Sequence, residues 1–146
     1  MSSLEFTVIG IPAPQGSKSP WGTEANPNTR PWRATVAANA AQAAVEASNG
    51  DFGPVGLQGA VFLHVSFYFP RPKGHYRTGK RAGELKDNAP EHYAKKPDLD
   101  KLLRAIGDAL TGTVLRDDAQ IVYLAASKRY AAPGEPARAE IRISAA

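Results

Sequence analysis

The run Lys96-Pro97-Asp98-Leu99-Asp100-Lys101-Leu102-Leu103-Arg104 decides how the second half of the chain folds. Pro97 disfavours the α conformation at the residue before it, and proline is well tolerated where a helix begins. Asp98 follows directly and is a preferred capping residue. Apolar residues then recur at helical spacing until Gly112 ends the pattern. The run therefore predicts a helix that begins next to Asp98 and carries Asp98 and Asp100 at its N-terminus.

A second acidic pair, Asp117 and Asp118, follows this helix. The helix, which we expect to end at about Leu110, is roughly 18 Å long at ~1.5 Å per residue. The segment from Thr111 to Asp118 extends to about 26 Å at ~3.3 Å per residue, so it is long enough to bring Asp118 or Asp117 beside Asp98. Carboxylates held together repel one another, and oxygen ligands that leave positions for water and phosphate suit Mg²⁺. The pattern predicts a divalent-metal site.

A purely structural role is the alternative for the same acids. Asp98 would then cap the helix, Asp100 would complement its dipole, and the second pair would form a polar turn before a strand. The helix between the two acidic segments and the basic segment before them favour the metal site.

Composition indicates one small domain that spans residues 1–146. A chain of 146 residues, 42% of them hydrophobic, suits a single core. No apolar stretch is long enough to cross a membrane, and the N-terminus lacks the features of a secretory signal. We therefore expect a soluble, cytoplasmic protein with no membrane partner. The absence of cysteine excludes disulfides, zinc ribbons and thiol catalysis, so any metal must be bound by oxygen or imidazole.

The excess positive charge lies between Arg71 and Lys96. This segment has eight basic and three acidic residues, a net charge of +5 in a chain whose net charge is +4. Its glycines and Pro90 predict a long, mobile loop over residues 71–96. Such a basic loop suits a polyanion such as nucleic acid, and a solvated insertion is the alternative. The candidate DNA-binding residues are Arg71, Lys73, Arg77, Lys80, Arg81, Lys95, Lys96 and, on the predicted helix, Lys101.

Strand and helix patterns alternate along the rest of the chain. Alternating apolar residues predict strands at Glu5–Gly10, Ala60–Phe69, Gln120–Tyr130 and Arg138–Ser144. Helical signals predict a helix at Trp32–Ala47, whose many alanines suggest close packing on a sheet. Together with the acidic helix, the order is β-α-β-α-β-β. We therefore expect an α+β single domain, with a mixed sheet of about four strands packed by two helices.

Residues near the first predicted helix leave alternatives open. Gln15, Ser17 and Lys18 are candidates for phosphate contact, although no nucleotide-binding loop surrounds them. Trp21 and Trp32 either stack on an unpaired base or anchor the loop to the core, and the core is favoured for Trp32.

Three motifs in residues 96–121 resemble the RusA family of Holliday junction resolvases, which is common in phages and prophages. They are Lys96-Pro97-Asp98-Leu99-Asp100-Lys101-Leu102, Asp108-Ala109-Leu110-Thr111-Gly112 and Asp117-Asp118-Ala119-Gln120-Ile121. The rest of the chain matches in element order. The resemblance implies a homodimeric, Mg²⁺-dependent endonuclease, with Mn²⁺ as a substitute metal and no small-molecule cofactor. Such an enzyme makes paired, symmetric nicks across a four-way DNA junction, in recombination, replication-fork repair or phage DNA processing.

By motif, the resemblance assigns the metal to Asp98, Asp100 and Asp118, and it leaves Asp117 as a supporting or turn residue. A metal held there would polarise the phosphodiester and orient a water molecule for in-line attack, leaving a 3′ hydroxyl and a 5′ phosphate.

Arg104 stands where the family's first-described member has a functional lysine. Arginine and lysine both supply positive charge near a scissile phosphate, but they differ in geometry and in the ability to lose a proton. Lys101 is an adjacent substitute for that role. An ion pair between Arg104 and Asp108, four positions apart on the helix, is the alternative.

Two other functions fit parts of the pattern. A non-catalytic, DNA-binding recombination accessory protein would use the basic loop and keep the acids for structure. A phosphohydrolase of small phosphate esters usually places the first acid of its DxD motif after an apolar strand, whereas here Lys95 and Lys96 come just before the motif. The sequence therefore favours a nuclease.

Overall fold

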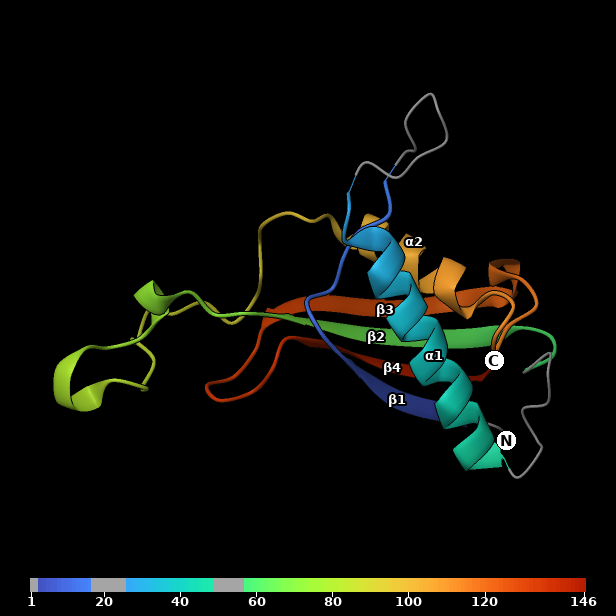
Figure 1. Ribbon diagram of the computed structural model, residues 1–146, viewed down its shortest axis with the longest axis horizontal. Coiled ribbons are helices and arrows are strands. Elements are labelled where there is room, and N and C mark those ends of the chain that lie inside the picture. The colour runs from blue at the N-terminus through green and yellow to red at the C-terminus, as the bar shows by residue number, and fades with distance from the viewer. Residues whose placement is uncertain (1–2, 17–25, 49–56) are drawn as a thin grey trace.

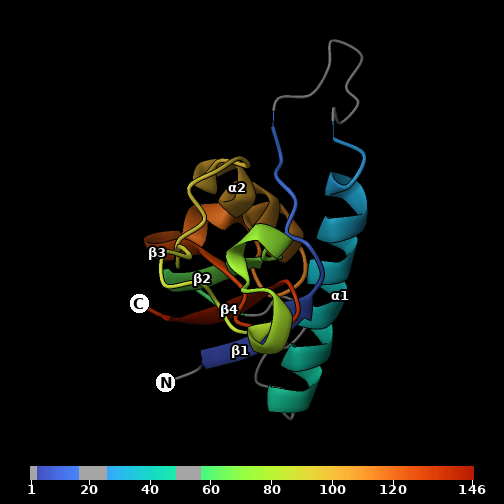
Figure 2. The same cartoon turned by 90° about the vertical axis from the view of Figure 1, so that its left-hand side faces the viewer.

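A four-stranded mixed sheet with two helices on one face forms the framework of the protein (Figures 1 and 2). The computed structural model describes residues 3–16, 26–48 and 57–146. The predicted order β-α-β-α-β-β is confirmed. The elements are β1 (Ser3–Ile9), α1 (Thr29–Ser48), β2 (Val61–Phe69), α2 (Leu99–Leu110), β3 (Ile121–Tyr130) and β4 (Arg138–Ala145).

The strands lie in the order β1-β4-β2-β3. β4 pairs antiparallel with both β1 and β2, whereas β2 and β3 run parallel. A parallel pair needs a crossover connection, and α2 is the helix in that crossover. The chain therefore leaves one end of β2, returns through α2 to the other end, and enters β3 there. This path places the two predicted acidic segments at the two ends of α2.

The core lies between the sheet and the helices. Every second residue of β2 is buried, and the matching residues of β4 complete that face of the sheet. α1 contributes Val36, Ala40 and Ala44 to the same core, so small side chains let it lie close to β1 and α2. Trp32 is 5% exposed, which confirms the prediction that it belongs to the core. Of the helices within the described ranges, none has the length and apolar character needed to cross a membrane.

Residues 70–96 project from the sheet as an arm, which we call the finger (green to yellow at the left of Figure 1). It is not featureless, because it contains two 3₁₀ turns, Lys73–His75 and Gly79–Arg81, and a bridge between Tyr76 and Leu85. Its base is anchored by Tyr93, whose ring stacks on Phe69 at 4.1 Å between centroids. The mobility expected for this segment stays a prediction.

Candidate active site along helix α2

The first acidic segment lies where the sequence predicts it. Asp98 is the N-cap of α2, with extended backbone and no capping hydrogen bond from its side chain, and Asp100 lies in the first turn. The Asp98 carboxylate is 3.7 Å from Nζ of Lys101. Lys128 of β3 supports the turn before the helix, because its Nζ donates hydrogen bonds to the main-chain oxygens of Lys95 (2.6 Å) and Pro97 (2.8 Å). The two acids are therefore presented on a supported helix N-terminus.

The second acidic segment forms a 3₁₀ turn at Asp118–Gln120. Asp117 caps it, since its Oδ1 accepts a hydrogen bond from the Ala119 N–H at 2.9 Å. The same bond lowers the pKa of Asp117. The Gln120 amide donates to the main-chain oxygens of Leu57 and Gly59, which fixes the turn beside the start of β2. These contacts give Asp117 the role of a turn residue and leave Asp118 as the member of the pair that lies against α2.

Asp118 lies against α2 at Gly107. A Cβ atom at position 107 would be 3.5 Å from both Cβ and Oδ2 of Asp118, which is ordinary contact, so a side chain larger than alanine would meet Asp118. A hydrogen bond with Asp117, partial burial and the negative charges of Asp117 and Asp108 raise the pKa of Asp118. Three carboxylates therefore influence one another at this end of the helix.

The acidic pair returns along α2 only as far as Gly107. Asp100 lies two helical turns before Gly107 on the same face, a rise of about 10 Å at ~1.5 Å per residue. The expectation that Asp118 or Asp117 reaches Asp98 is therefore wrong. The connecting segment is folded rather than extended, because Val114 and Leu115 are buried in the core. Within the described part of the chain, no three His, Cys, Asp or Glu side chains lie close enough together to hold one metal ion.

Arg104 occupies the helix surface between the two acidic groups. It follows Asp100 by one turn and precedes Asp108 by one turn, and its side chain is exposed. The alternative Arg104–Asp108 ion pair does not form. Asp108 instead accepts a hydrogen bond from Nε2 of Gln15 and lies 3.8 Å from Nη1 of Arg33. The Arg104 side chain is therefore exposed on the surface of α2 between the two acidic groups.

Gln15 joins three separate elements at this site. Its backbone N–H donates to the main-chain oxygen of Lys101 at 2.9 Å, its side-chain amide donates to Asp108, and its Oε1 accepts from Arg33 at 2.6 Å. Gln15 is 8% exposed. Its contacts therefore support the site, and its side chain is not open at the surface for phosphate binding. Ser17, Lys18 and Trp21 lie outside the described residues. No sequence signal singled out Arg33 or Lys128, because their roles come from contacts across the fold.

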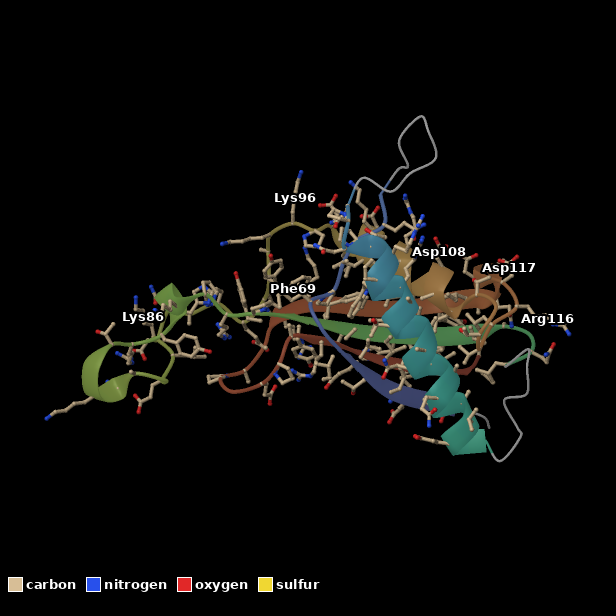
Figure 3. The ribbon with its side chains drawn as sticks, in the orientation of Figure 1. Phe69, Lys86, Lys96, Asp108, Arg116 and Asp117 are labelled. Carbon is tan, nitrogen blue, oxygen red and sulfur yellow. The ribbon has the colours of Figure 1, made fainter. Side chains whose placement is uncertain are left out.

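The candidate DNA-binding residues divide into anchored and free side chains. Arg71 is anchored: its guanidinium donates to the main-chain oxygens of Pro90 (2.7 Å) and Ala131 (3.1 Å) and lies over the Tyr130 ring. Arg77 pairs with Asp87 and Arg81 with Glu84, each at 2.7 Å. Figure 3 shows Lys86 far out on the finger and Lys96 near the helices. Of the candidates, Lys73, Lys80, Lys95 and Lys96 have no ion-pair or hydrogen-bond partner within the described part of the chain, and neither has Lys86, which was not among the candidates.

A cavity of about 820 Å³ opens beside Asp98. It lies between residues 9–14, residues 26–35 around the start of α1, and the segment that leads from the finger into α2. Lys96, Asp98 and Lys101 contribute to its wall, so it adjoins the first acidic segment.

Comparison with known proteins bears on the whole chain. The family model of endodeoxyribonuclease RusA matches residues 12–144. A curated relative, described as "Uncharacterized protein YqaN" of Bacillus subtilis (strain 168), is 29% identical over 151 residues, which cover 98% of this chain and 96% of the relative. The family match therefore includes the finger, both ends of α2 and the three strands β2, β3 and β4.

We expect Gln15→Ala to lower the free energy of unfolding by about 1–3 kcal/mol, because Asp108 and Arg33 lose a shared, largely buried partner. Urea unfolding followed by circular dichroism measures the change. Gln42→Ala is the matched control, since Gln42 makes one exposed hydrogen bond within α1, and we expect less than about 0.5 kcal/mol there. Equal effects of the two substitutions would show that Gln15 does not join the elements as described.

Proposed function

The chain belongs to the RusA family of endodeoxyribonucleases, and from that premise we propose that it resolves four-way DNA junctions by paired, symmetric, Mg²⁺-dependent hydrolysis of phosphodiesters. One observation carries the proposal: acids from both family motifs lie along one face of α2, with the exposed Arg104 between them. Such a face suits cleavage of a DNA backbone. Cleavage needs cations near the phosphate and carboxylates that recruit a metal.

The donor set suits Mg²⁺. All candidate ligands are carboxylate oxygens, which this metal prefers. Mg²⁺ at sites of phosphate chemistry is usually bound through one or two carboxylates, with water and substrate phosphate as the other ligands, so a preformed group of three acids is not required. The hydrogen bond with Asp117 and burial raise the pKa of Asp118 most, and the negative charges of Asp117 and Asp108, which a cation would offset, raise it further. We propose that Asp98 and Asp100 at the N-terminus of α2, and Asp118 beside Gly107, bind Mg²⁺, or Mn²⁺ in its place, when the DNA phosphate lies between the two acidic segments.

The residues around the acids have separate roles in the proposed reaction. A bound metal ion would supply an activated water and neutralise charge on the phosphate. Arg104 would contact the scissile phosphate and stabilise the negative charge that develops on it. Lys101 would hold Asp98 in place through their ion pair. Gln15 would keep Asp108 from competing for Arg104.

The finger would provide the second region of DNA contact. Its free lysines extend from the base near α2 to the far end of the finger (Figure 3). Lysine side chains bind phosphates without sequence preference, and they release counterions when they do so. DNA held at both the finger and α2 would span more than one arm of a junction, which suits a branched substrate better than a linear duplex. We propose that such an enzyme acts in the cytoplasm of a bacterial or phage-infected host cell.

A homodimer is supported by the free edge of β3. Val122, Tyr123 and Leu124 are 54%, 62% and 51% exposed on this edge strand. An exposed apolar edge is a natural site for association with a second copy. Two copies related by a two-fold axis would direct two identical sites at two symmetric strands of a junction.

Substitution of Asp100 tests the nuclease function. With Asp100→Asn we expect junction cleavage to fall by about a thousandfold, because a metal ligand is lost, while junction binding persists. Cleavage of a synthetic mobile four-way junction, with linear duplex as a reference and with Mg²⁺ or EDTA, measures the effect. Asp87→Asn, on the finger, is the matched control and should cut normally. Binding of the junction without cleavage by the unsubstituted chain would instead favour a non-catalytic accessory protein.

Substitution of Leu124 tests the dimer. We expect Leu124→Lys to convert the dimer into a monomer, because a charged side chain blocks association through a strand edge. Sedimentation equilibrium measures the mass, and junction cleavage should change from paired to single nicks. Val45→Lys is the matched control. Val45 is also an exposed apolar residue but lies on α1, so this variant should remain dimeric. A dimeric Leu124→Lys protein would exclude this edge as the interface.

A further inference from the structure

We propose that the cavity beside Asp98 binds one unstacked nucleobase of the DNA strand that is cut. This proposal rests on the nuclease function proposed above and names the part of the substrate that enters the protein. It concerns a base next to the scissile phosphate, at the point where a junction branches.

The cavity has the size and the walls of a pocket for a planar ring. Its volume of about 820 Å³ falls within the range of about 300–1,000 Å³ that is common for ligand pockets. Tyr93 of the finger is partly exposed and contributes aromatic surface, whereas Trp32 of α1 and Phe69 of β2, 5% and 3% exposed, lie behind it, and several prolines complete the apolar wall. Aromatic side chains stack on bases of any sequence, so these walls suit a base that has left the DNA stack.

The charges at the cavity match the rest of a nucleotide. Lys96 and Lys101 supply cations that suit the phosphate of the nucleotide. Asp98, a proposed metal ligand, lies in the same wall, so a base inside the cavity would have its phosphate near the proposed site of cleavage. An apolar interior with cations beside it matches a base joined to a phosphate, whereas a purely apolar ligand would gain nothing from the lysines.

Polar groups in the wall are available to fix the orientation of the base. The backbone N–H of Asn28 donates to Oδ1 of Asn26 at 2.8 Å. The side-chain amide of Asn28 has no hydrogen-bond partner within the described part of the chain, and an amide offers both a donor and an acceptor to a base edge. These groups give the cavity the means to prefer some bases over others.

A four-way junction supplies such a base at low cost. Taking a base out of a duplex requires unpairing and unstacking, and the cost is smallest where the base is already poorly paired. The branch point of a junction meets this condition. Occupation of the cavity would therefore favour junctions over linear duplex and give cleavage a preference for the base at that position.

The test places 2-aminopurine, a fluorescent base that brightens when it is unstacked, at successive positions around the branch point. The full chain is added in EDTA, so the signal does not depend on cleavage. We expect fluorescence to rise at one position per cut strand, next to the cleavage site.

Thr35→Trp fills the cavity from the exposed side of α1, where Thr35 lines it. Ala38→Trp, exposed on the same helix and outside the lining, is the matched control. With Thr35→Trp we expect the fluorescence rise to be lost and cleavage to slow at least about tenfold. Junction affinity should stay within about twofold, because the lysines are intact. An abasic site at the responsive position should restore cleavage by Thr35→Trp, since no base remains to be accommodated.

Two results would overturn the cavity proposal while leaving the nuclease function intact. They are cleavage by the unsubstituted chain without a fluorescence rise at any position, and equal behaviour of Thr35→Trp and Ala38→Trp. Failure of the unsubstituted chain to bind or cut any junction would overturn the proposed function itself, and the cavity proposal with it.

Discussion

The close approach of helix α2 to the Asp117–Asp118 turn is the contact on which the candidate site depends. Position 107 is a glycine, and Asp118 lies at ordinary contact distance, 3.5 Å, from the place where its Cβ would be. Because α2 is the crossover between two parallel strands, its position is set by the sheet, and the turn at the start of β3 is set by the same sheet. A glycine or alanine at position 107 fits beside Asp118, whereas a larger side chain would occupy the place of Asp118. Without that approach, the acids of the two motifs would lie on separate surfaces.

The remaining features of the site are arranged around this helix. Its buried face is formed by Leu102, Ile106 and Leu110, which fix the rotation of the helix on the sheet. With that rotation, Asp100 and Arg104 are exposed on one side of α2, and Asp118 lies beside the C-terminal half of the helix at Gly107. Gln15 holds Asp108 to the loop before α1, and Lys128 holds the turn before Asp98. The chemistry is therefore presented on a rigid element that is supported at both ends, which is what precise positioning of a phosphate requires.

Local features of the sequence predicted most of the fold. The alternation in residues 61–69 and 138–144 predicted two strands, and Pro97 with Asp98 predicted the start of α2, because these signals depend on neighbouring residues only. The separation between Asp98 and Asp118 could not be predicted, because it depends on burial of Val114 and Leu115 in the shared core. The link between Gln15, Arg33 and Asp108 joins three distant segments and leaves no pattern in the sequence. The short 3₁₀ turns of the finger were missed because glycines and charges there resemble an unstructured loop.

The most direct measurement compares Gly107→Leu with Gly107→Ala in cleavage of a four-way junction, with junction affinity and thermal unfolding measured in parallel. An added Cβ meets Asp118 at ordinary contact distance, so alanine should cut like the unsubstituted chain. A leucine must displace Asp118, and cleavage should fall by about 10- to 100-fold while affinity and folding persist. Normal cleavage by Gly107→Leu would contradict the account, since Asp118 would then act without its place against α2.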